Sequence, residues 1–131
     1  MSLKLIGYGH PNISARHLTT IEFTSSSDVS PRGDCIVACK VRFDVKELQK
    51  LLSAPKLKIK IVVGHLSDEV ECTPNHAFND SSEIVLRMSS VATHRTFGIK
   101  ANKGAGMLKR ELVEMLKNSE QIAEITIEEE P

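Results

Sequence analysis

HPNISARHLTTIEFTSSS, residues 10–27, has a counterpart in TPNHAFNDSSEIVLRMSS, residues 73–90. At this offset of 63, five of the eighteen positions are identical, beginning with Pro11-Asn12 against Pro74-Asn75. We therefore interpret the chain as one domain, 1–131, made of two similar halves, approximately 1–64 and 65–131. The alternative is that two units of like patterning resemble each other without a duplication.

Apolar and polar residues alternate along several short stretches, which is the pattern of half-buried strands. In residues 20–24, Ile21 and Phe23 share one face and three polar residues share the other. The spacing predicts about eight strands, near residues 3–8, 20–24, 35–41, 58–63, 70–73, 84–88, 97–101 and 123–127.

Two helices are expected, one in each half. Asp44 followed by Glu47 resembles a capping box and begins a helix that Pro55 ends. A second helix is predicted from about Gly104 to Asn118. Each half then has the order β-β-β-α-β.

The turn at Gly33-Asp34 resembles the Gly-Asp turn of duplicated cradle-loop barrels. Glycine accepts a positive φ and aspartate bonds nearby N–H groups, so the pair suits a tight entry into the following strand. We predict an α+β, mainly β fold: a compact, cradle-loop-barrel-like barrel of two halves related by a pseudo-twofold axis, with one helix at each end. Halves of ~60 residues bury too little core alone, and closure removes their free edges. The alternative is an open α+β sandwich with both helices on one side.

The composition is that of a globular domain, with 40% hydrophobic and 26% charged residues among 131. It excludes a disordered tail, a coiled coil and a collagen-like chain. Three cysteines without a CxxC pair favour a reducing cytoplasm, and neither a signal peptide nor a membrane span is predicted. Aromatic residues are 4% and the net charge is +0, which makes nucleic acid a weak candidate partner.

Charge is unevenly distributed, although the net is zero. Residues 1–64 contain ten Lys and Arg against five Asp and Glu, and residues 65–131 contain seven against twelve. Solvated faces and attraction between the halves explain this pattern, and the alternative is head-to-tail association or docking on an anionic partner. The oligomeric state, monomer or homo-oligomer, stays open.

The first candidate ligand-binding residues are His10, Asn12, His17 and Thr19. Glycines and Pro-Asn mark an ordered turn here. The two histidines are seven residues apart with a loop between them, so both can reach one pocket. The alternative is that these side chains bond the turn backbone.

The second candidate group, in the other half, is His94, Arg95, Thr96 and Lys103. The segment 100–106 leads into the predicted second helix, whose N-terminal N–H groups and dipole favour an anion. Arg95 and Lys103 add positive charge. A helix start with surface lysines is the alternative.

No linear motif identifies catalytic residues. The candidates are His10 or His17 as a general base, with Asp34 as the group that orients it. Cys35 with a histidine base is a further arrangement, although the strand pattern places Cys35 in the core. HxxxH and CxxC spacings are absent, so no metal site is predicted, and no cofactor is indicated.

Several segments form a joint motif: GHPNI at 9–13, HLTTIE at 17–22, RGDCI at 32–36, Arg95-Thr96, IKANK at 99–103 and RELV at 110–113. Together they resemble the signature of the DUF371 family, a group of small, mostly archaeal proteins. The resemblance covers nearly the whole chain and implies a single cytosolic domain, but it supplies no reaction. The family pattern often has Asp where this chain has Asn102.

The favoured function is binding of a small anionic ligand, bearing phosphate or carboxylate, in a cleft between the halves. One alternative is a small-metabolite hydrolase or lyase that uses a histidine base. Another is an interaction module whose basic 40–60 face binds nucleic acid or protein.

Overall fold

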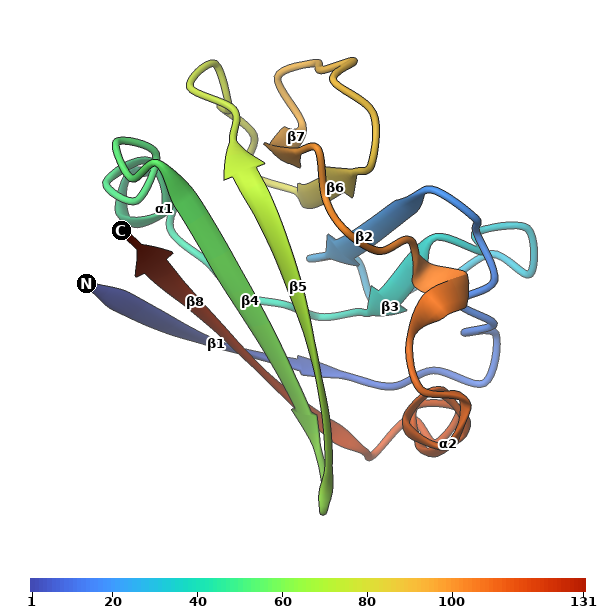
Figure 1. Ribbon diagram of the computed structural model, residues 1–131. Coiled ribbons are helices and arrows are strands. Elements are labelled where there is room, and N and C mark those ends of the chain that lie inside the picture. Colours follow the sequence, from blue (N-terminus) through green and yellow to red (C-terminus); the bar gives the residue numbers. More distant parts are fainter.

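The computed structural model describes all of residues 1–131 and is mainly β (Figure 1). Its strands are β1 (Ser2–Tyr8), β2 (Thr20–Thr24), β3 (Ile36–Ala38), β4 (Lys56–Val63), β5 (Leu66–Pro74), β6 (Glu83–Arg87), β7 (Thr96–Ile99) and β8 (Ile122–Glu130). The helices are α1 (Val45–Gln49), α2 (Arg110–Met115) and a 3-10 turn, η1 (Ala105–Met107). The predicted α+β, mainly β class is confirmed.

All eight strands belong to one mixed sheet, in the order β1-β8-β4-β5-β7-β6-β2-β3. The sheet curls, so that the long strands β1, β8, β4 and β5 face the short strands across the core (Figure 1). The helices α1 and α2 lie at opposite ends of the molecule, and the two termini lie side by side.

The alternation of residues determines which face of the sheet is buried. In the antiparallel pair of β2 and β6, Ile21 lies opposite Leu86 and Phe23 lies opposite Ile84. All four side chains are fully buried. Burial of each such side chain contributes ~1.5–3 kcal/mol, so these cross-strand pairs hold the two halves together.

The sheet is not closed, in contrast to the predicted barrel. Its edge strands, β1 and β3, meet only at a bridge in which Tyr8 and Cys39 exchange two main-chain hydrogen bonds of 2.8 and 2.9 Å. Lys40 follows at once with a φ of 54°, and its N–H donates to Ser26 O. Arg42, two residues later, forms no main-chain hydrogen bond with β1, so the edge beyond this bridge stays open.

Both helices are shorter than predicted. Asp44 caps α1 by accepting the N–H of Lys46, as the sequence indicates, but the regular helix ends at Gln49. The second predicted helix is divided, because Leu108 has an extended backbone between η1 and α2. Neither α1 nor α2 has the length and apolar character that crossing a membrane requires.

The two halves share most of their strand pairings, the pair of β5 and β7 having only the Tyr8–Cys39 bridge as its counterpart. β3 runs parallel to β2 and β7 runs parallel to β6, with a register shift in each pair. Lys40 after β3 and Lys100 after β7 both have a left-handed backbone, with φ of 54° and 51°.

Loop hydrogen bonds show which residues correspond between the halves. His10 Nδ1 accepts the N–H of Asn12, as Asn75 Oδ1 accepts the N–H of Ala77. Each loop then closes through the carbonyl of His10 or Asn75 onto the N–H three residues later. His10 therefore corresponds to Asn75, and the sequence match of the two Pro-Asn pairs is two residues out of register with the structure.

Candidate functional site

The predicted histidines His10 and His17 both stabilise turns. The Nδ1 atom of His17 accepts the N–H groups of Thr19 and Thr20, each at 3.1 Å. The Nδ1 atom of His10 accepts the N–H of Asn12 at 3.0 Å, and the Asn12 amide donates to Val29 O at 2.8 Å. These contacts agree with the alternative in which the side chains bond the backbone of their own turns rather than a ligand.

Replacing His17 with alanine is expected to lower the free energy of unfolding by ~1–2 kcal/mol, because two N–H groups lose their acceptor. Asparagine at His17 is expected to recover most of the loss, since its side chain forms the same kind of turn. Urea unfolding of both variants measures this. Equal losses would show that the imidazole acts through packing rather than as an acceptor.

The glycine-rich segment before α2 is packed against the first histidine loop. The N–H of Gly106 donates to His17 O at 2.8 Å, and a Cβ atom at Gly104 would lie 2.3 Å from Leu18 O. The Arg110 guanidinium joins the two loops through the carbonyls of Ala15 and Ala105. The structure therefore brings these predicted segments together, but protein fills the place expected for an anion.

Lys103 does not point at this loop contact. Its ammonium donates to Asp68 at 2.6 Å, and the same carboxylate accepts the N–H groups of Lys109 and Glu69 at 2.9 and 2.8 Å. Burial acts to raise the pKa of Asp68, but these three donors outweigh it and hold the pKa below its usual range. The charge of Lys103 is thus neutralised within the protein.

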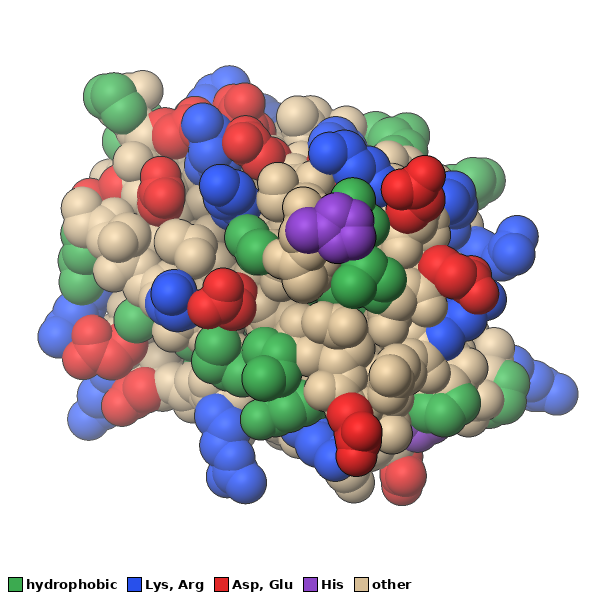
Figure 2. Space-filling view, turned by 90° about the horizontal axis from the view of Figure 1, so that it is seen from below, with side chains coloured by type: hydrophobic (Ala, Val, Ile, Leu, Met, Phe, Trp, Pro, Cys, Tyr) green, Lys and Arg blue, Asp and Glu red, His purple; other side chains and the backbone are tan.

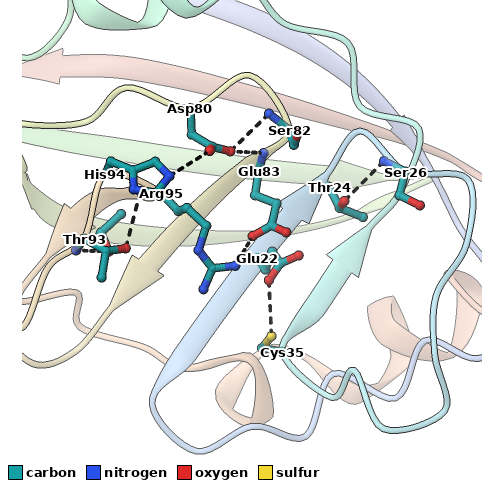
Figure 3. A network of polar contacts seen from close by, with 11 residues as sticks. Glu22, Thr24, Ser26, Cys35, Asp80, Ser82, Glu83, Thr93, His94 and Arg95 are labelled. Carbon is teal, nitrogen blue, oxygen red and sulfur yellow. Dashed lines mark hydrogen bonds and ion pairs between the residues drawn. The ribbon is translucent and has the colours of Figure 1, made fainter.

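His94 and Arg95 lie just before β7 (Figure 3), and Thr96 is the first residue of that strand. Arg95 forms an ion pair with Glu83, and His94 Nε2 lies 3.4 Å from an Asp80 carboxylate oxygen. Thr96 is 1% exposed, and its hydroxyl accepts a main-chain N–H within the loop. Each of these cations, like Lys103, therefore has an acidic partner within the protein.

Cys35 is half-buried beside this network rather than in the core as predicted. Its Sγ lies 3.6 Å from a Glu22 carboxylate oxygen (Figure 3). Burial and the negative charge of Glu22 raise the pKa of Cys35 to about 12, so the thiol is not activated as a nucleophile. Burial and Glu83 in turn raise the pKa of Glu22.

Asp34 does not orient either histidine. Its carbonyl oxygen accepts the N–H groups of Arg16 and His17 at 2.9 and 3.1 Å, but its carboxylate bonds neither His10 nor His17. The predicted pair of general base and orienting group is therefore not formed. The residue instead positions the loop that contains His17.

A groove of about 1030 Å³ runs along the open edge of the sheet. It lies between β1 and the segment 40–43, with serines from two loops beside it; its lining is Lys4, Leu5, Ile6, Tyr8, Ser25, Ser27, Lys40, Val41, Arg42, Phe43 and Ser81. Three of these residues are cations and none is acidic. The groove is therefore basic on its polar side and apolar at its floor, where Leu5 and Val41 are buried.

Two of the three cations in the groove have no acidic partner. The Lys40 ammonium lies 5.9 Å from the centroid of the Tyr8 ring, a cation–π distance, and Arg42 forms no ion pair. Lys4 contacts Glu124 at 3.3 Å, with both side chains exposed. The sequence shows Lys40 and Arg42 within the basic 40–60 segment, but it does not show that β1 lies beside them.

Two of the other lysines of the basic 40–60 segment pair with nearby carboxylates, and Lys46, Lys56 and Lys60 form no ion pair. Lys58 lies between Glu69 and Glu130 at 3.7 and 3.4 Å, and Glu130 raises the pKa of Lys58. Lys50 pairs with Glu47 on α1. Figure 2 shows both signs of charge intermingled on the face seen from below, so that face has no continuous basic surface for a nucleic acid.

Comparison with known proteins is consistent with the joint motif in the sequence. The family model described as "Domain of unknown function (DUF371)" matches residues 5–130. The chain belongs to this family. It is similar to an uncharacterized protein of Methanocaldococcus jannaschii, with 35% identity over 121 residues, which cover 87% of this chain and 90% of that protein. The family match includes every residue that lines the groove except Lys4.

Proposed function

We propose that this DUF371 protein binds an anionic ligand, bearing carboxylate or phosphate, in the groove along the open edge of the sheet. The observation that supports the proposal is the lining: Lys4, Lys40 and Arg42 with no carboxylate. Arg95, Lys103 and Lys58 are paired with acids, whereas Lys40 and Arg42 are not. Other unpaired lysines, such as Lys56 and Lys60, lie outside the groove. A negative group in the groove would supply the missing partner.

The groove also limits what the rest of the ligand can be. Its volume of about 1030 Å³ is at the upper end of the ~300–1,000 Å³ typical of ligand pockets. Hydroxyls of Ser25, Ser27 and Ser81 offer hydrogen bonds, and Phe43 offers an apolar surface. The ligand that fits has an anionic group joined to a larger, partly apolar body. None of the predicted site residues lines this groove.

We further propose that the halves, approximately 1–64 and 65–131, arose by duplication and form a barrel-like fold open at one edge. The matched pairings of both halves and the paired left-handed lysines support this. The three free cysteines support a reducing compartment such as the cytoplasm.

Thermal unfolding with phosphate, citrate and nucleotides, each at rising concentration, tests the proposed function. A ligand at 100 times its Kd is expected to stabilise the protein by ~2.7 kcal/mol. Lys40→Met combined with Arg42→Met is expected to weaken binding at least ~10-fold, since two charge-assisted hydrogen bonds are lost.

Lys100→Met is the matched control for the lysine substitution, because Lys100 has the same left-handed backbone but lies outside the groove. This variant is expected to bind like the wild type. If no anion stabilises the folded protein, or if Lys100→Met weakens binding as much as the double variant, the proposed function is wrong.

A further inference from the structure

The open edge of β1 presents main-chain groups without partners. Tyr8 directs its N–H and C=O to Cys39, and in an antiparallel strand alternate residues direct these groups to the same side. Lys4 and Ile6 therefore direct theirs to the open edge, while Leu5 and Gly7 pair with β8. No hydrogen bond outside the ladder with β8 reaches the main-chain groups of Lys4 or Ile6. Both residues also line the basic groove.

The corresponding edge in the second half is capped by the chain itself. After the left-handed Lys100, Asn102 returns to β5 and donates its N–H to Glu71 O at 3.0 Å. Its side-chain oxygen accepts the N–H of Glu71 at 2.9 Å. Asn102 thus supplies both an N–H donor and an oxygen acceptor, as a neighbouring strand would.

The first half lacks this cap. Arg42 follows the left-handed Lys40 by two residues, as Asn102 follows Lys100, but its side chain has no acceptor for an N–H. The guanidinium lines the groove instead. The equivalent position is therefore occupied by Asn102, which closes the edge of β5, and by Arg42, which leaves the edge of β1 open beside a positive charge.

We infer that the ligand of this groove is an extended acidic segment of a partner protein, which pairs with β1 as an added strand. This inference rests on the proposed function and names the class of its ligand. The segment forms main-chain hydrogen bonds with Lys4 and Ile6, and its carboxylates contact Lys40 and Arg42. Tyr8 is already paired with Cys39, so the free edge runs from Ser2 to Ile6, and at ~3.3 Å per residue about five residues cover it.

Fluorescence anisotropy with a labelled Glu-Val-Glu-Val-Glu peptide tests this inference. In an extended peptide the N–H groups of the Glu residues point to one side and those of the Val residues to the other. One peptide carries N-methyl groups on its Glu residues, and a second carries them on its Val residues. The peptide whose methylated nitrogens face β1 is expected to bind at least ~10-fold more weakly, and the other peptide is expected to bind like the unmodified one. Charge and side chains are the same in both peptides.

Ile6→Pro is the matching change in the protein. Proline removes the N–H that faces the open edge and spares the ladder with β8, a position at which strands tolerate proline. The variant is expected to lose the peptide at least ~10-fold. Circular dichroism establishes that the variant is folded, and the methylated peptides test the wild type independently.

The outcomes separate this inference from the proposed function. If phosphate or citrate binds through Lys40 and Arg42 but the two methylated peptides bind equally, strand addition is wrong and anion binding stands. If an oligonucleotide binds and the peptide does not, strand addition is also wrong. If neither anions nor the peptide bind, both proposals fall.

Discussion

Alanine at Gly9 is expected to lower the free energy of unfolding by ~3 kcal/mol or more, at the upper end of the cost of overpacking. A Cβ atom there would lie 2.3 Å from the carbonyl oxygens of both Leu116 and Asn118. These are main-chain atoms just after α2, and Leu116 O also accepts the N–H of His10 at 2.8 Å. The loop after β1 and the end of α2 would have to separate.

Gly33→Ala is the matched control for this prediction. Its Cβ would first meet the Cδ1 atom of Ile36 at 3.1 Å, the flexible end of a side chain. The expected loss is therefore under ~1 kcal/mol. Guanidinium unfolding of both variants gives the comparison, and similar losses for Gly9 and Gly33 would refute the proposed contact of the β1 loop with α2.

Asp68→Ala is expected to cost ~3 kcal/mol of stability, because an ammonium and two main-chain N–H groups lose one buried acceptor. Asp68 is 7% exposed, and its donors come from β5 and from the segment before α2. The side chain of Lys103 is 29% exposed. Water therefore still solvates part of its ammonium group when Asp68 is removed, which places the expected cost at the lower end of the range for a broken buried ion pair.

The effect of Asp68→Ala depends on pH. The pKa of Asp68 is lowered in the folded protein, so its contribution is fully present above the unfolded value of ~3.9 and is lost as pH falls through the folded value. The difference in unfolding free energy between wild type and variant is therefore expected to be constant from pH 5 to 7 and to shrink below ~4. A constant difference down to pH 2 would show that Asp68 acts without its charge.

Local patterns predicted the elements well where one physical cause decides them. Period-two alternation identified β2 and β6, because a strand with one buried face must place Ile21 and Phe23 on the same side. Asp44 marked the start of α1 because an N-cap is a local contact. The regular helix ends earlier than predicted, at Gln49, and single turns with i to i+3 hydrogen bonds continue from there to Ala54.

The candidate site was predicted less well, because residue type does not reveal the partner. His10 and His17 are suited to ligands, but here they accept N–H groups within their own turns. Arg95 and Lys103 have the charge for an anion, but Glu83 and Asp68 neutralise them. Each of these partners is distant in sequence or is a main-chain group, so composition and spacing cannot identify it.

The sequence by itself determined the mainly β class, the family, the excess of basic residues in the first half and the strand faces that are buried. Only the tertiary structure decided that the edge of β1 stays open and that Lys40 and Arg42 face it without acids. The reason is that the partner of an edge strand comes from a segment distant in sequence. Lys40 and Lys100 share a left-handed backbone, but Asn102 bonds the main chain of Glu71, whereas Arg42 forms no hydrogen bond with β1. That difference depends on how distant strands are placed.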